Sequence, residues 1–239
     1  MAIQLSDGIH HVTLITRNVQ ANVGFYVGFL GLRLVKRTAG FEDSRQLHLF
    51  YGNHEGAPGS LVTFLVWEDG APGRVGTGQI SEIAFAVPSN SIGEWLVRAL
   101  DAQIQVSGPT REITESVLRL KDPDGVIVKL VGVNAPIQAS GELPVIDKLH
   151  SITILTAEPE QTTKFLRRFG YQPSGGAGAI QRMRSASDVV DVRDAQGYVP
   201  GIPGTGTVDH VALRATDIAV VRAMEDELAT LNSSPTNVH

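Results

Sequence analysis

The chain has 239 residues, a formal net charge of −5 and no cysteine, with 42% hydrophobic and 19% charged residues. This globular composition excludes a disordered chain, and the net charge gives no electrostatic reason to expect nucleic acid or an anionic membrane as a partner. Without thiolates, any metal must be held by His, Asp or Glu. We expect a soluble cytoplasmic protein, because the first residues lack the order of a secretory signal and every apolar run is too short to span a bilayer.

The first part of the chain has the pattern of a strand, a helix and further strands. Residues 9–15 alternate in hydropathy as a half-buried strand does. Asn18 can cap a helix whose apolar residues recur at helical spacing, and Gly31 can end it. Strand-like runs follow at residues 45–51 and 61–67.

The same order recurs from residue 81. A strand is predicted at residues 81–87, followed by a helical stretch and by strands at residues 116–120 and 126–131. The Asp-Pro-Asp-Gly sequence at residues 122–125 predicts a turn between the last two. The pattern of a strand, a helix and further strands is therefore visible twice and plausible a third time.

Two further strands, each followed by a helix, are predicted in the second half of the chain. A strand at residues 150–155 precedes a helical stretch that Gly170 closes, and a strand at residues 209–214 precedes a helix that starts near Asp217. The segment 132–144 is low in charge and rich in Gly and Pro, which indicates a linker.

We therefore predict a first pair of modules at residues 1–135, a linker at residues 136–147 and a second pair at residues 148–239.

Four polar residues occupy the same position in the four opening strands. His11, Glu82, Ser151 and His210 fall in register when the strands are aligned on their apolar alternation. A lone His on a strand is usually structural, but two in register within a repeat favour metal ligation. Alternation along the strand also places Thr13 on the face of His11, where it can contact the metal site or the substrate.

Several short motifs resemble the vicinal oxygen chelate superfamily of glyoxalases, bleomycin-resistance proteins and extradiol dioxygenases. They are Gly-Ile-His-His-Val-Thr-Leu at residues 8–14, Phe-Tyr at 25–26, Leu-Gly-Leu at 30–32 and the Asp-Pro-Asp-Gly turn. The His-His-Val-Thr-Leu start and the Val-Asp-His at residues 208–210 look most like ring-cleaving dioxygenases acting on hydroquinones and catechols. The resemblance implies an α+β fold in which repeated βαβββ modules form concave half-barrels. It implies two module pairs, with the fourth module incomplete.

The resemblance also implies a metal site where the first module meets the fourth. In that branch two His and one Glu hold Fe(II), or sometimes Mn(II), and the two His correspond to His11 and His210. The Glu would fall beyond His239, so the chain is expected to lack the last strands of its fourth module and could be inactive. Thr13 and His10 are expected beside the metal, although alternation turns His10 to the other face and its inclusion follows from the resemblance alone.

The implied substrates are a small aromatic compound and dioxygen. A homodimer is expected from the way such sheets usually pair.

Two alternatives remain open. A protein of this superfamily could bind an aromatic compound without turnover, or act as a glyoxalase-like lyase or isomerase. The lyase would need carboxylates on the final strands of the first two modules, but residues 61–67 contain no acid and Lys129 stands where the second module should supply one. Glu82 is then expected to be a salt-bridge partner or a rim residue.

Other His and Asp residues are expected to play no part in the site. His48 and His54 lie in a hairpin-like region where exposure to solvent is the default, and surface positions are expected for His150 and Asp191.

Overall fold

The computed structural model of the chain describes residues 6–39, 46–134 and 146–230. The first two modules comprise β1 (Ile9–Thr16), α1 (Val19–Val23), the π-helical turn η1 (Gly24–Phe29), β2 (Arg33–Ala39), β3 (Leu47–Gly52), β4 (Leu61–Val66), β5 (Gln79–Pro88), the 3₁₀ turn η2 (Ser89–Ser91), α2 (Ile92–Asp101), β6 (Val106–Glu112), β7 (Glu115–Lys121) and β8 (Ile127–Val133). The last two comprise β9 (Leu149–Thr156), α3 (Pro159–Arg168), β10 (Gln172–Ala177), β11 (Ile180–Arg184), β12 (Val189–Asp194), β13 (Val208–Leu213) and α4 (Ile218–Thr230).

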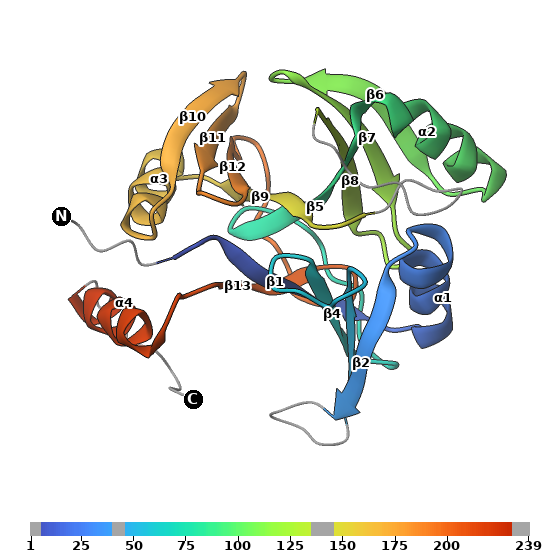
Figure 1. Cartoon of the computed structure of the whole chain (residues 1–239), viewed down its shortest axis with the longest axis horizontal. Coiled ribbons are helices and arrows are strands. Elements are labelled where there is room, and N and C mark those ends of the chain that lie inside the picture. Colours follow the sequence, from blue (N-terminus) through green and yellow to red (C-terminus); the bar gives the residue numbers. More distant parts are fainter. Residues whose placement is uncertain (1–5, 40–45, 135–145, 231–239) are drawn as a thin grey trace.

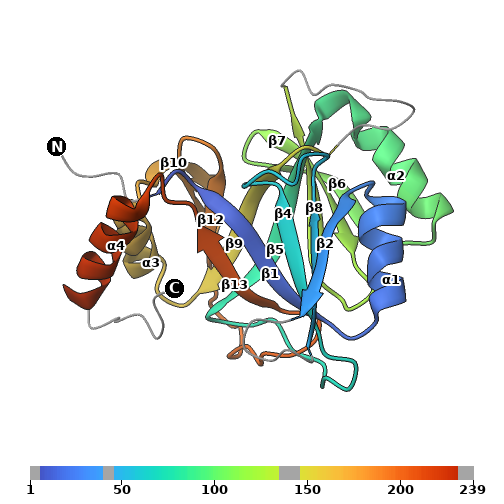
Figure 2. The ribbon, with the colours of Figure 1, turned by 60° about the horizontal axis from the view of Figure 1, so that its bottom comes forward.

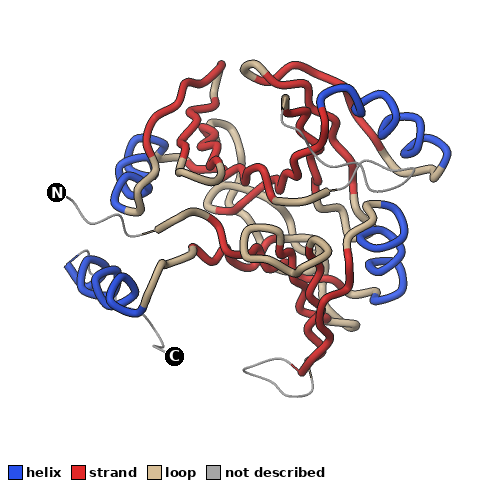
Figure 3. The backbone as a smooth tube through the Cα atoms, viewed as in Figure 1, coloured by secondary structure: helices blue, strands red, loops and turns tan. Residues whose placement is uncertain are grey.

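The strands form two mixed sheets, with the orders β13-β1-β4-β3-β2 and β10-β11-β12-β9-β5-β8-β7-β6. The five-stranded sheet joins the first and fourth modules, and the eight-stranded sheet joins the second and third. Figure 1 shows the eight-stranded sheet curled into a half-barrel, with α2 and α3 on its outer side. Figure 2 shows β13 beside β1, and Figure 3 shows the strands gathered inside the flanking helices. The predicted α+β fold of repeated modules is confirmed.

Local signals fix the helix ends. The Asn18 side chain accepts a hydrogen bond from the Ala21 amide at 3.0 Å and caps α1. Gly31, which follows the helix, has a φ of +77°, a conformation that favours glycine. At the fourth helix, the Asp217 carboxylate accepts bonds from the first turn of α4, as its position before that helix predicts.

The Asp-Pro-Asp-Gly turn ties the first module to the second. Asp122 Oδ1 accepts hydrogen bonds from the amides of Asp124 and Val126 at 2.9 and 2.8 Å, which closes the turn between β7 and β8. Asp122 Oδ2 accepts a hydrogen bond at 3.0 Å from the hydroxyl of Tyr26, which is buried in η1. The Tyr26 ring packs against Phe64 and Tyr51, so the turn is anchored on the aromatic core of the first module.

Three of the strands that the sequence did not predict are edge strands; β11 and β12, which lie inside the eight-stranded sheet, were not predicted either. β2, β6 and β10 lie at the sheet edges and are largely exposed, so their side chains lack the apolar alternation that marks a half-buried strand. The predicted strands at residues 61–67, 116–120 and 126–131 are confirmed with small shifts at their ends. The strand predicted at residues 45–51 is also present, although its first residue lies outside the described chain.

The division of the chain at residues 136–147 stays a prediction, because most of that segment lies outside the described residues. The described part of the fourth module contains β13 and α4. Among the described helices, none combines the length and the apolar character that a membrane span requires.

Candidate active site

Antiparallel pairing of β1 with β13 brings the two predicted ligands together. Thr13 lies opposite His210, and His11 lies opposite Ala212. The rings of His11 and His210 contact each other edge to face, with their centroids 5.5 Å apart. The predicted site between the first and fourth modules therefore has its two His in contact.

A chain of hydrogen bonds runs from His210 across three strands. Thr13 Oγ1 lies 3.0 Å from His210 Nε2 and 2.8 Å from Thr63 Oγ1, and Thr63 Oγ1 lies 2.9 Å from His48 Nε2. Both threonines are fully buried. Each hydroxyl contacts the next group in the series, so the chain holds the His210 ring in one orientation.

The carboxylate of Asp209 determines which group donates and which accepts along this series of hydrogen bonds. Its Oδ2 lies 2.7 Å from His210 Nδ1, and this hydrogen bond lowers the pKa of Asp209. A carboxylate only accepts, so in the neutral His210 ring the proton is on Nδ1 and the lone pair is on Nε2. Thr13 then donates to His210, Thr63 donates to Thr13, and His48 Nε2–H donates to Thr63.

His10 and His11 form a second pair of rings. Their Nδ1 atoms are 2.9 Å apart, so one ring donates to the other. The prediction that His10 points away from His11 is wrong, because the strand pairing is irregular between Ile9 and His11 and strict alternation fails at such a bulge.

Burial favours the neutral form of three imidazoles, those of His10, His11 and His48. Burial, followed by repulsion from His10, His210 and His48, lowers the pKa of His11 to about 4. Burial also lowers the pKa values of His10 and His48. Neutral imidazole is the form that offers a lone pair to a metal ion.

The pair of His residues fits part of a metal site. His11 Nε2 makes no hydrogen bond to any described residue, whereas the single lone pair of His210 Nε2 accepts a hydrogen bond from Thr13, so an ion could bind both nitrogens only by displacing that bond. The described chain contains no group of three or more His, Cys, Asp or Glu residues suited to a metal. Both predicted His ligands are among the described residues, and the carboxylate expected from the resemblance corresponds to none of them.

His48 is the residue that sequence reasoning missed. It was expected to be exposed, but it is half-buried in β3 and joins the site through Thr63. The parallel pairing of β1 with β4 places Thr63 opposite Thr13, and nothing near His48 in the sequence reveals that pairing. His54, by contrast, is exposed as expected.

The second half-barrel holds the remaining candidates. The prediction of surface positions for His150 and Asp191 is wrong: both are buried, with hydrogen bonds to Glu115 and Arg182 respectively. Glu82 is confirmed as a salt-bridge partner. Its carboxylate lies 2.8 Å from Arg119 and 3.1 Å from Lys129.

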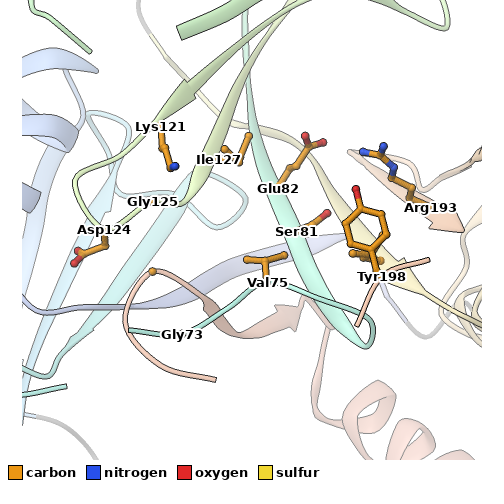
Figure 4. Close-up of a pocket in the computed structure, with 12 residues that line it drawn as sticks. Gly73, Val75, Ser81, Glu82, Lys121, Asp124, Gly125, Ile127, Arg193 and Tyr198 are labelled. Carbon is orange, nitrogen blue, oxygen red and sulfur yellow. The ribbon is translucent and has the colours of Figure 1, made fainter. Parts of the chain in front are cut away.

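Two surface hollows are lined by other residues than His11 and His210. The larger, about 450 Å³, has Glu82, Arg193 and Tyr198 among its walls (Figure 4). The smaller, about 250 Å³, lies at the start of β1 and includes Arg214, whose charge contributes to the lowered pKa of His10.

Comparison with known proteins shows which family the chain is similar to. The family model described as the Glyoxalase/Bleomycin resistance protein/Dioxygenase superfamily matches residues 8–130. MhqO of Bacillus subtilis, provisionally named a ring-cleaving dioxygenase, is 34% identical over 88% of this chain and 70% of its own length. The chlorohydroquinone/hydroquinone 1,2-dioxygenase of Sphingobium indicum is 30% identical over 94% of this chain and 75% of its own.

A solved structure is similar over nearly the whole chain. A crystal structure of a provisionally named dioxygenase from Bacillus subtilis superposes with a TM-score of 0.87 at 31% identity, covering 95% of this chain and 76% of that one. The arrangement of strands that brings His11 and His210 together is therefore shared with a related protein of known structure.

Proposed function

Because this chain belongs to the glyoxalase, bleomycin resistance protein and dioxygenase superfamily, we propose that it is a metal-dependent ring-cleaving dioxygenase acting on a hydroquinone or a catechol-type aromatic. The observation that carries the proposal is the contact of two imidazole rings, His11 and His210, on paired strands. Relatives named for ring cleavage support the reaction class. Dioxygen is then the second substrate.

His11 and His210 would hold the metal, Fe(II) or Mn(II), and imidazole is a ligand suited to Fe(II). Such an ion, when bound, passes electron density between an aromatic substrate and dioxygen. Asp209 keeps the proton of His210 on Nδ1, as carboxylates beside metal-binding His residues usually do. Thr13 donates to His210 Nε2, the nitrogen that would bind the ion, so a bound ion would replace this hydrogen bond and the Thr13 hydroxyl would turn to Thr63.

The tautomers assign a role to His10. If His11 binds through Nε2, its Nδ1 carries the proton and donates to His10 Nδ1. A neutral His10 then carries its own proton on Nε2, where it can donate a hydrogen bond to a substrate oxygen. Thr13 is assigned the positioning of His210 rather than proton transfer.

Oxygen uptake tests the proposed reaction. The chain is purified anaerobically, loaded with Fe(II) and mixed with hydroquinone or catechol, and the product is analysed by mass spectrometry. Both oxygen atoms of one O₂ are expected in the ring-opened product. The His210→Ala variant is expected to consume no oxygen above the rate of the metal alone, while His54→Ala, which changes an exposed residue, keeps the activity.

The same measurement separates the alternative of a non-catalytic binding protein. If the Fe(II)-loaded chain binds the aromatic compound with equal affinity in chelator and never consumes oxygen, the dioxygenase proposal is wrong. The cytoplasmic location and the homodimer expected from the sequence stay predictions.

A further inference from the structure

The second half-barrel repeats the strand pairing of the active site around different side chains. In the first and fourth modules, Thr13 on β1 pairs with His210 on β13. In the third and second modules, Thr153 on β9 pairs with Glu82 on β5. The hydroxyl contacts match as well, because Thr13 lies 3.0 Å from His210 Nε2 and Thr153 lies 3.2 Å from Glu82 Oε2. Glu82 thus takes the place of the proposed metal ligand His210.

One buried cation lies at the centre of this second cluster. The side chain of Lys129, on β8, is 1% exposed. Its Nζ lies 3.1 Å from Glu82 Oε2, 3.3 Å from Glu112 Oε2 and 4.0 Å from Asp191 Oδ2. It also donates to Thr153 Oγ1 at 3.2 Å. Oxygen atoms from four strands therefore surround a single positive charge, as they do around a hard metal ion.

The charges of the cluster depend on that ammonium. Arg119 binds Glu82 and Glu112, and Arg182 binds Asp191 and Glu115, which His150 also contacts. Without Lys129, four carboxylates face two guanidinium groups, and two negative charges remain uncompensated. Buried charges left unpaired are strongly destabilising, so another cation would be favoured there.

A route from solvent to the cluster already exists. Glu82 lines the hollow of about 450 Å³, and Figure 4 shows its side chain on β5 with Lys121 to one side and Arg193 and Tyr198 to the other. Lys121 and Tyr198 are exposed, so the hollow is open to water. A small hydrated ion can therefore reach the carboxylate of Glu82 from the surface.

We propose that the oxygen atoms around Lys129 form a second cation site, which the Lys129 ammonium group itself occupies. The lysine thereby keeps metal ions out of the second half-barrel, and His11 and His210 remain the proposed metal site of the described chain. The ring of carboxylate and hydroxyl oxygens is suited to Mn²⁺, Mg²⁺ or Ca²⁺ once the lysine side chain is removed. The inference does not depend on the proposed dioxygenase reaction.

The test measures Mn²⁺ binding by electron paramagnetic resonance in a His11→Ala background, where the first site is disabled. The double variant H11A/K129A is expected to bind about one Mn²⁺ per chain, at least about tenfold more tightly than H11A alone. Adding Glu112→Gln removes one carboxylate and is expected to weaken the new site about tenfold or more. In H11A/K129M the methionine fills the space of the lysine, so no Mn²⁺ site is expected.

Each other outcome overturns the inference. A folded H11A/K129A that binds Mn²⁺ no better than H11A shows that the oxygen ring is not a cation site. Mn²⁺ that binds H11A and is lost in H11A/E112Q shows that Lys129 does not exclude metal. If H11A/K129A fails to fold, its circular dichroism is recorded with and without Mn²⁺ or Ca²⁺: recovery of the fold with the ion supports the site, and no recovery overturns it.

Discussion

Removal of the Thr63 hydroxyl tests the hydrogen-bond chain that holds His210. Thr63→Val keeps the shape of the side chain but deletes the oxygen that lies 2.8 Å from Thr13 Oγ1 and 2.9 Å from His48 Nε2. Thr13 is fully buried, so its oxygen loses a donor that water cannot replace, whereas half-buried His48 can turn to solvent. Leaving a buried polar atom without its hydrogen-bond partner lowers stability by about 1–3 kcal/mol, and we expect the free energy of unfolding to fall by that amount.

The same change is expected to weaken metal binding. An ion bound at His210 Nε2 would displace the Thr13 hydroxyl, which can then donate to Thr63. Thr63→Val removes that acceptor, and loss of such an outer hydrogen-bond partner typically lowers metal affinity roughly 10- to 100-fold. Urea unfolding and an Fe(II) or Mn²⁺ titration measure the two effects, and Thr63→Ser, which keeps the hydroxyl, is the matched control. Unchanged metal affinity in Thr63→Val, or an equal loss in Thr63→Ser, would refute the idea that this hydroxyl orients His210.

Three further changes test the packing and electrostatics of the fold. Burial raises the pKa of Asp122 from 3.8 to about 6, so its contribution to stability is present below pH 4 and is lost as the pH rises through 6. Urea unfolding should therefore show the wild type gaining up to about 3 kcal/mol over Asp122→Asn between pH 7 and pH 4, and an equal difference at both pH values would contradict the raised pKa. Burial alone would raise the pKa of Glu115, but His150 and Arg182 lower it to about 2, so its contribution is present above pH 4.5 and is lost as the pH falls toward 2. Glu115→Gln should accordingly flatten the fall in stability between pH 5 and pH 2, and an unchanged acid transition would rule out that ion pair as its cause. Phe64→Ala, at a fully buried ring, should lower the free energy of unfolding by about 3–5 kcal/mol in chemical denaturation, and a loss under 1 kcal/mol would show that the aromatic core is loosely packed there.

The repeat and the two His residues could be predicted from the sequence because both are marked by local signals. The His-His-Val-Thr-Leu start and the Asp-Pro-Asp-Gly turn are short, and helix caps such as Asn18 and Asp217 lie next to the helices that they begin. Apolar alternation then aligned His11 with His210, and the pairing of β1 with β13 brings them into contact.

The residues that sequence reasoning misplaced depend on pairing between distant strands. His48 enters the site only because β4 lies between β1 and β3. Asp191 is buried because Arg182, on the neighbouring strand, neutralises it, and a charged residue is otherwise expected at the surface. Edge strands such as β2 carry no buried face, so their sequences lack the signal by which strands are predicted.

The metal content of the anaerobically purified protein tests most directly whether His11 and His210 form a metal site. Elemental analysis of iron and manganese is compared between the wild type, His11→Ala, His210→Ala and the surface variant His54→Ala. We expect about one iron or manganese ion per chain in the wild type and in His54→Ala, and its loss in both site variants. Metal that remains in His11→Ala and His210→Ala would contradict the proposed site, and with it the dioxygenase mechanism built on those two residues.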